Sequence, residues 1–283
     1  MAVRRANFAG SWYDGGSRAC RATIEKYIAD AKDLSSDKIK RIGGVVPHAG
    51  WSFSGQIACN VFHCLKTGTD PDVVVIFGTH LAPAYPNMIM VEGEWETPLG
   101  NIEIDGDFAA RLVEGFDFSV QDPASAPPDN TIELQLPFVK YFFPKAKLVP
   151  VSAAPTKTAA QIGERAAQIA QESDTPVRFI GSTDLTHYGP NYMFVTHGMG
   201  EESLKWVRDV NDKRIVDMMI SLQAESIVTE GLQHDNTCCP GAAAAAIAAG
   251  KKMGAAEAEL LIYMTSYDVH PNASFVGYAG IVF

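Results

Sequence analysis

Long apolar segments are absent from this chain of 283 residues. No hydrophobic run approaches the ~20 residues that a membrane-spanning helix needs, so we do not expect the chain to cross a bilayer. The segment from Phe8 to Asp14 is too short and too polar for the core of a signal peptide. Internal repeats and separating linkers are also missing, which predicts a single domain over residues 1–283.

Positive charge is scarce, with 23 lysine and arginine residues against 33 aspartate and glutamate residues. The resulting net charge of −10 argues against nucleic acid as a main partner, because phosphate binding needs a basic face. Cysteine is also rare, and its five positions show no disulfide-scaffold spacing. This cysteine usage fits a reducing compartment best, so we expect a cytoplasmic protein.

Hydrophobic residues make up 47% of the chain, which is enough for a sizeable core. Three apolar runs, at residues 42–46, 73–77 and 177–180, predict strands. Their near-continuous Val, Ile and Phe content indicates burial on both faces and therefore central places in a sheet. A helix between the first two runs makes those strands parallel. The predicted fold class is α/β, one domain with a mixed, mostly parallel sheet flanked by helices.

The remaining elements follow from periodicity and from glycine and proline punctuation. Helices are predicted at residues 18–32, 56–66, 107–114, 158–172, 198–222 and 242–249. Further strands are predicted at residues 88–91, 100–104, 147–152, 260–264 and 275–283. The strands at 88–91 and 100–104 would form a hairpin-like excursion around Trp95. Residues 130–138 fit either an extended or a helical segment, and their Glu133 and Gln135 either support a site or are ordinary surface.

Three of the seven histidines come shortly after the three central runs. His48 follows Pro47, His80 follows Gly78-Thr79, and His187 ends the segment that begins at Gly181. One loop histidine by itself is most often an ordinary hydrogen-bonded side chain. Three in this position predict a shared cluster, since the carboxyl ends of strands form the ligand-binding edge of an open α/β sheet.

The segment Cys238-Cys239-Pro240 directly precedes the alanine-rich run at 242–249. Proline suits the first turn of a helix, so Pro240 predicts a helix start with Cys239 as its N-cap. The positive end of a helix dipole lowers the pKa of a thiol, and Cys239 is therefore well placed to be a thiolate.

Several motifs, taken in their order along the chain, resemble the Memo family, which includes the AmmeMemoRadiSam system protein B members. They are Ala9-Gly10-Ser11-Trp12-Tyr13, Pro47-His48-Ala49-Gly50-Trp51, Gly78-Thr79-His80, Ile132-Glu133-Leu134-Gln135-Leu136-Pro137-Phe138, Ser182-Thr183-Asp184-Leu185-Thr186-His187-Tyr188-Gly189 and Asp235-Asn236-Thr237-Cys238-Cys239. The resemblance runs from about residue 6 to the C-terminus. It implies a fold similar to class III (LigB-type) extradiol dioxygenases, in which a non-haem Fe(II) sits at a sheet edge.

Carried over residue by residue, the resemblance implies that His48, His80 and Cys239 are the metal ligands. His187 would be the acid/base catalyst outside the ligand set, with Asp184 beside it. Two histidines and one anionic residue leave open positions for O2 or substrate, as in iron oxygenases. Iron is the expected metal, and the softer thiolate also suits copper or zinc. Cys239 is expected to face the histidines, and Cys238 to point to roughly the opposite side.

The sequence departs from the family pattern at three places. Asp129-Asn130 stands where the family has Glu-His, so a pocket histidine is replaced by Asn130. The loop before His80 is one residue shorter than the family's, and Pro240 follows Cys239 where glycine is expected. The first departure weakens any transfer of substrate identity.

These observations support more than one function. The first hypothesis is a metal-dependent redox enzyme acting on a small molecule. The alternatives are a zinc-dependent hydrolase with His187 as proton shuttle, a non-catalytic metal- or peptide-binding scaffold, and an enzyme with Cys239 as nucleophile. By family resemblance, AMMECR1-like and radical-SAM proteins are expected partners, and a homo-oligomer is compatible with the sequence.

Overall fold

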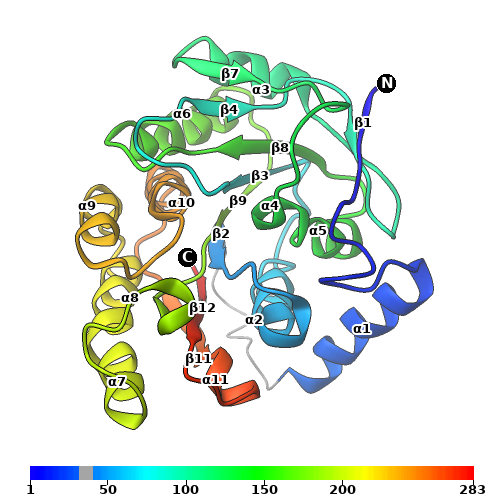
Figure 1. Cartoon of the computed structure of the whole chain (residues 1–283). Helices are drawn as coiled ribbons and strands as arrows, with labels where there is room; N and C mark the ends of the chain where they lie inside the picture. The colour runs from blue at the N-terminus through cyan, green and yellow to red at the C-terminus, as the bar shows by residue number, and fades with distance from the viewer. Residues whose placement is uncertain (32–40) are drawn as a thin grey trace.

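The computed structural model describes residues 1–31 and 41–283, and its central feature is a nine-stranded mixed sheet (Figure 1). Eight strands follow the order β10-β12-β2-β9-β3-β8-β4-β7. The ninth strand, β11, lies outside this order and pairs antiparallel with β12. The bounds of these strands are β2 (Gly43–Val46), β3 (Val73–Gly78), β4 (Asn87–Ile89), β7 (Phe118–Val120), β8 (Lys147–Ser152), β9 (Val177–Ser182), β10 (His187–Tyr188), β11 (Glu259–Thr265) and β12 (Phe275–Val282). A smaller sheet contains β1 (Val3–Arg4), β5 (Glu94–Trp95) and β6 (Ile102–Glu103).

The α/β class and the central, buried strands are confirmed. The strands β2, β9, β3 and β8 pair in parallel, and every residue of β2, β3 and β9 is buried. The first two predicted strands are parallel, with β9 between them. Antiparallel strands join on both sides, as β12 pairs with β2 and β4 pairs with β8.

Helices cover both faces of the sheet (Figure 1). One side carries α6 (Thr158–Glu172), α8 (Asp212–Ile220), α9 (Ala224–His234) and α10 (Pro240–Lys252). The other carries α1 (Ser17–Asp30), α2 (Trp51–Cys64), α4 (Asn130–Glu133) and α5 (Leu136–Phe142). The remaining helical segments are α3 (Gly106–Val113), the 3-10 turn η1 (Pro190–Tyr192), α7 (Glu201–Trp206), the π-helical segment η2 (Val207–Asn211) and α11 (Ser266–Val269).

The alternation of side chains along β3 divides the core into two layers. Val73, Val75 and Phe77 pack into the cluster that contains the apolar residues of α6 and α10. Val74 and Ile76 pack into the cluster with α2 and α5. Successive side chains of a strand point to opposite faces, so a run of apolar residues is what a sheet covered on both sides requires.

Small residues let α10 approach the sheet and its neighbouring helix closely. A Cβ added to Gly181 in β9 would lie 2.9 Å from the Ala242 carbonyl oxygen. At Gly163 in α6, an added Cβ would lie 1.9 Å from the Ala245 carbonyl oxygen. The alanine-rich sequence of α10 is therefore the sequence of a helix packed backbone to backbone, which places its N-terminus at the end of β9.

The structure corrects several predicted elements. Residues 88–91 do not form a hairpin with 100–104: β4 joins the main sheet, and the hairpin consists of β5 and β6. Residues 130–138 are helical in α4 and α5. The helix predicted at 18–32 ends at Asp30, and Lys32 lies outside the described residues. Among the described residues, no helix is long and apolar enough to span a membrane.

Candidate metal site

The site lies where three parallel strands end at the same level. Val46 of β2 pairs with Ser182 of β9, and Phe77 of β3 pairs with Gly181. The segments that follow these strands carry His48, His80 and Asp184, so strand register brings together residues far apart in sequence. This is the carboxyl edge at which open α/β sheets bind ligands.

His48 is buried at the end of β2 and held from both sides. Its backbone N–H donates to Asp184 Oδ1 at 2.7 Å, and its Nδ1 lies 3.1 Å from Ser182 Oγ. The Ser182 hydroxyl donates its own proton to the Thr131 carbonyl at 2.6 Å, so it accepts from Nδ1–H of His48. In neutral His48 this tautomer leaves the Nε2 lone pair available, as a metal ligand requires.

His80 reaches the same place through an unusual turn after β3. The preceding Thr79 has φ 72°, a left-handed conformation that β-branched residues rarely adopt. Its backbone N–H donates to Thr131 Oγ1 and its hydroxyl donates to Asp129 Oδ2, each at 2.6 Å. These bonds hold the strained turn that brings His80 Nε2 to 3.1 Å from His48 Nε2.

The two cysteines come from the segment before α10. Cys239 is the N-cap of that helix and Pro240 its first residue, as predicted. The backbone N–H of Cys239 donates to Thr183 Oγ1 at 2.9 Å, and that of Cys238 donates to the Asp184 carbonyl at 3.1 Å. The segment is therefore fixed to the chain that leaves β9.

The expectation that Cys238 points away from the histidines is wrong. Its Sγ lies 3.2 Å from His48 Nε2 and accepts a hydrogen bond from Asp184 N–H at 3.3 Å. Cys239 Sγ lies 3.8 Å from Cys238 Sγ, so both thiols are near the histidines. Simple alternation along an extended chain does not apply here, because a bridge between Leu185 and Thr237 fixes the backbone on the way into α10.

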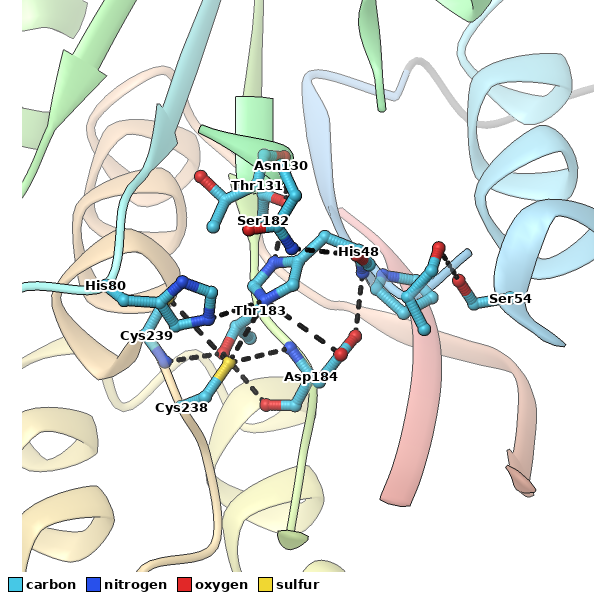
Figure 2. Close-up of polar contacts among 12 residues, drawn as sticks. His48, Ser54, His80, Asn130, Thr131, Ser182, Thr183, Asp184, Cys238 and Cys239 are labelled. Atoms are coloured by element: carbon cyan, nitrogen blue, oxygen red, sulfur yellow. Dashed lines mark hydrogen bonds and ion pairs between the residues drawn. The ribbon is translucent and has the colours of Figure 1, made fainter. Parts of the chain in front are cut away.

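One ligand atom from each of His48, His80, Cys238 and Cys239 lies within 4.8 Å of the other three (Figure 2). This spacing fits a single ion, because metal–nitrogen and metal–sulfur bonds of about 2.0–2.3 Å place tetrahedral ligand atoms roughly 3–4 Å apart. Two imidazoles and two thiols suit zinc, copper or iron better than magnesium or calcium. The cluster contains the predicted ligands and one further sulfur; their role as ligands stays a prediction.

The groups of this cluster shift one another's pKa values. Burial opposes protonation of His48, but the Asp184 carboxylate and the Cys238 thiolate raise its pKa to about 9. Burial also opposes ionisation of Cys238, but hydrogen bonds from Cys239 and the charge of His48 bring its pKa well below the ordinary value. Burial and the Cys238 charge raise the pKa of Cys239. These directions favour a thiolate at Cys238 over one at Cys239, contrary to the expectation from the helix start, and metal binding would release protons.

The two predicted catalytic residues lie beside this cluster. Asp184 is buried, and its Oδ2 lies 3.9 Å from His48 Nε2. His187 begins β10, and its Nδ1 lies 3.1 Å from the Leu185 carbonyl, so Nδ1–H is the donor. This contact leaves Nε2 of neutral His187 free to accept a proton. His187 is outside the four-residue cluster, as predicted.

A cavity of about 500 Å³ opens onto the cluster. Residues that line it include His48, His80, Asp184 and His187 together with the aromatic side chains Trp12, Phe53, Tyr192 and Tyr278. A second cavity of about 570 Å³ lies on the side of Cys238 and shares His80, His187 and Tyr192 with the first. Volumes of this size suit small-molecule ligands.

A buried carboxylate anchors the segment between Asp184 and His187. Asp212 Oδ1 accepts hydrogen bonds from the backbone N–H of Thr186, at 3.0 Å, and from its hydroxyl. The Tyr263 hydroxyl donates to Asp212 Oδ2 at 2.8 Å. Burial raises the pKa of Asp212 to about 7, although these hydrogen bonds favour its charged form.

Glu133 and Gln135 are buried and support the site, which decides between the two interpretations of their sequence. Gln135 Nε2 donates to the Pro47 carbonyl at 2.9 Å, next to His48. Glu133 accepts from the backbone N–H groups of Asn7 and Phe8 and from the Tyr13 hydroxyl. It thereby ties the N-terminal loop that supplies Trp12 to the cavity.

Some functional neighbours could not be found from sequence patterns. Asn130, noted as a replaced histidine, lines the cavity and donates to the His48 carbonyl at 3.2 Å. Tyr192 lies in the 3-10 turn η1 and Tyr278 lies in β12, and both line the cavity. Nothing in the sequence around them predicts this position.

Comparison with known proteins places these observations in a family. The sequence profile described as Memo-like protein matches residues 4–282. A MEMO1 family protein of Thermococcus onnurineus is 33% identical over 290 residues, covering 99% of each chain. One of Methanopyrus kandleri is 36% identical over 287 residues, covering 97% of this chain and 96% of the relative. A crystal structure of an uncharacterized protein from Escherichia coli K12 matches with a TM-score of 0.50 at 10% identity, covering 80% of this chain and 91% of that one, which shows likeness of fold alone.

Proposed function

Because the chain belongs to the Memo-like protein family over nearly its whole length, we propose that it is a metal-dependent redox enzyme acting on a small molecule. The observation that carries this proposal is the joint position of His48, His80 and two thiols on a cavity that also contains Asp184 and His187. A bound iron or copper ion would supply one-electron chemistry and an electrophilic centre. The comparisons do not specify a substrate.

The protein's own residues have separable roles in this proposal. His48, His80 and Cys239 hold the ion, with Cys238 as a further sulfur donor. His187 accepts or donates a proton through Nε2, since its Nδ1–H is engaged with the Leu185 carbonyl. Asp184 fixes the backbone of His48 through the hydrogen bond to its N–H.

Cys238 supports a second candidate function. Four protein ligands close a tetrahedral site, as in structural zinc centres, whereas catalytic sites keep a position for water or substrate. If Cys238 stays bound, the protein would be a non-catalytic scaffold that carries zinc. Contact with AMMECR1-like and radical-SAM proteins, proposed from the family resemblance, is compatible with either function.

Anaerobic purification followed by elemental analysis and oxygen-consumption assays distinguishes these functions. Iron or copper with oxygen uptake supports the redox enzyme. Tightly bound zinc without oxygen uptake supports the scaffold or a zinc hydrolase, and hydrolysis of ester substrates separates those two. Absence of every metal after reconstitution with iron, copper or zinc would contradict the metal site itself.

His187→Ala is the matched test of the proton-transfer role. We expect this variant to retain the metal content of the wild type while losing turnover by about 10²-fold or more, as for other general acid–base residues. Loss of metal in His187→Ala would show that His187 is a metal ligand and not the proton-transfer residue. His48→Ala is the reference variant, in which metal and turnover should disappear together.

A further inference from the structure

The cavity of about 500 Å³ is acidic and aromatic. Among the described residues that line it, none is a lysine or arginine, and Asp184 is the one carboxylate. Two thiolates would neutralise the charge of a divalent metal ion, so the Asp184 carboxylate would leave the occupied site with net negative charge. In the occupied site, where His48 is a neutral ligand, an anionic ligand would therefore find no cationic side chain in this lining.

Asp184 has one oxygen available to a ligand. Its Oδ1 accepts the hydrogen bond from His48 N–H at 2.7 Å. Its Oδ2 receives no hydrogen bond from the described residues; the nearest basic atom is His48 Nε2 at 3.9 Å. The residue as a whole is 4% exposed. Because Asp184 lines the cavity, a ligand bound there can supply the donor that Oδ2 lacks.

Aromatic side chains line the same cavity. Trp12 and Tyr192 are 40% and 41% exposed, whereas Tyr278 is buried. Burial, followed by the nearby charge of Asp184, raises the pKa values of Tyr192 and Tyr278, which agrees with their closeness to this carboxylate. The faces of aromatic rings attract organic cations, most strongly in sites shielded from water.

We propose that this cavity binds a small organic ammonium ion of the arylalkylamine class. The ammonium group donates to Asp184 Oδ2, and the apolar part of the ligand packs among Trp12, Phe53 and Tyr192. The proposal names the substrate class of the metal site and so rests on the proposed function, but the cation contacts use Asp184 and aromatic rings rather than the four metal-binding candidates.

Binding of matched probes tests this selectivity. Benzylamine, benzyl alcohol and benzoate share one ring and differ in charge at neutral pH. Calorimetric titrations with metal-free and zinc-loaded protein should give a benzylamine affinity at least about tenfold above that of benzyl alcohol, and benzoate measures the response to the opposite charge. Benzyltrimethylammonium, which has no lone pair to ligate zinc, should also bind better than benzyl alcohol.

Variants locate the cation. Asp184→Asn can keep the bond from His48 N–H through its amide oxygen, and should lose the preference for benzylamine by about tenfold. Tyr192→Leu leaves the carboxylate intact and should weaken benzyltrimethylammonium several-fold. Asp107→Asn removes the same charge from the exposed first turn of α3 and should change neither.

The proposal would be overturned by equal binding of benzylamine and benzyl alcohol, by no binding of either cation, or by an unchanged preference in both Asp184→Asn and Tyr192→Leu. Benzylamine binding that requires zinc and is not shared by benzyltrimethylammonium would mean direct metal ligation, and would also overturn it. A parallel zinc titration distinguishes failure of the proposed metal function from failure of the proposed amine site. Cation selectivity without zinc binding would contradict the metal function alone. Zinc binding without cation selectivity would contradict the amine site alone.

Discussion

At the level of single residues, the thiols of Cys238 and Cys239 are adjacent in the chain yet have different surroundings. Cys238 contacts His48 and the backbone N–H of Asp184, whereas Cys239 is buried at the start of α10. Burial opposes ionisation of both thiols, but hydrogen bonds from Cys239 and the charge of His48 lower the pKa of Cys238, whereas burial and then the contact with Cys238 raise the pKa of Cys239. A metal ion that binds both sulfurs must therefore displace a proton from Cys239.

The absorption spectrum of the cobalt-substituted protein should show how many cysteine sulfurs bind the metal. With both cysteines bound, Co²⁺-loaded protein should show a thiolate-to-cobalt charge-transfer band, and Cys238→Ser or Cys239→Ser should each reduce it by about half. Cys64→Ser, at the end of α2 and outside the cluster, is the control and should leave the band unchanged. A full band in Cys238→Ser would show that Cys238 does not bind the metal, and would support a site of three protein ligands with one open position.

The identity of the clustered residues was more predictable than their orientation. Strand ends in the sequence grouped His48 and His80 with His187, and a proline-started helix marked Cys239; the family resemblance then named His48, His80 and Cys239 as the ligand set. The direction of Cys238 could not, since it depends on hydrogen bonds to Thr183 and Asp184, which are more than 50 residues away. The sequence around Cys238 does not predict hydrogen-bond partners that lie so far away in the chain.

Asp212 should make stability fall as pH rises. Its pKa is about 7 in the folded protein, above the ordinary aspartate value of 3.8, so the folded state binds this proton more tightly than the unfolded state. The stabilisation is complete below about pH 4 and disappears as pH increases through 7, with a loss on the order of 2–4 kcal/mol.

Asp212→Asn should remove this component of the pH dependence. Chemical denaturation of wild type and variant between pH 4 and pH 8 measures it, as the difference between the two stability curves. Asp209→Asn, an exposed acidic position in η2, is the control. Parallel curves for wild type and Asp212→Asn would contradict the raised pKa.

At the level of elements, the contact between α6 and α10 should be sensitive to a single methyl group. Gly163→Ala places a Cβ 1.9 Å from the Ala245 carbonyl oxygen, and both partners are helix backbone that cannot rotate away. We expect a loss of about 1–3 kcal/mol or more in the free energy of unfolding, despite the better helix propensity of alanine. Urea denaturation measures it, and Gln161→Ala on the exposed face of α6 should be neutral or slightly stabilising. An unchanged midpoint in Gly163→Ala would show that the helices can separate freely.

Elements with strong internal patterns were predicted well, and elements defined by their partners were not. The bounds predicted for β8 and α6 are those observed, because apolar alternation and helical periodicity are properties of the segments themselves. The two-residue β10 and three-residue β7 exist only through pairing with β12 and β4. The π-helical segment η2 likewise has no sequence signal in a helix that reads as regular.

At the level of the whole molecule, metal removal should lower thermal stability without unfolding the protein. The sheet and both core layers form without contacts to the ion, so the metal-free fold should persist. A metal at a hundredfold excess over its Kd adds about 2.7 kcal/mol, which corresponds to roughly 4–5 °C in Tm for a chain of 283 residues. Differential scanning calorimetry before and after chelation measures the shift. His187→Ala should show the same shift and His48→Ala none; a shift retained in His48→Ala would mean that the ion binds elsewhere.

The long sequence separation of the clustered residues has a consequence for the order of assembly. His48 and His80 are 32 residues apart, and His48 and Cys238 are 190 apart, so an unfolded chain would have to close large loops to offer these donors together. Only the neighbouring thiols are close before the strands pair. In the proposed metal protein, loading would then follow formation of β2, β9 and β3, and newly synthesised protein would pass through a folded, metal-free stage. In that interval Cys238, whose lowered pKa favours the reactive thiolate, would be susceptible to oxidation, and the supply of metal would set how long the interval lasts.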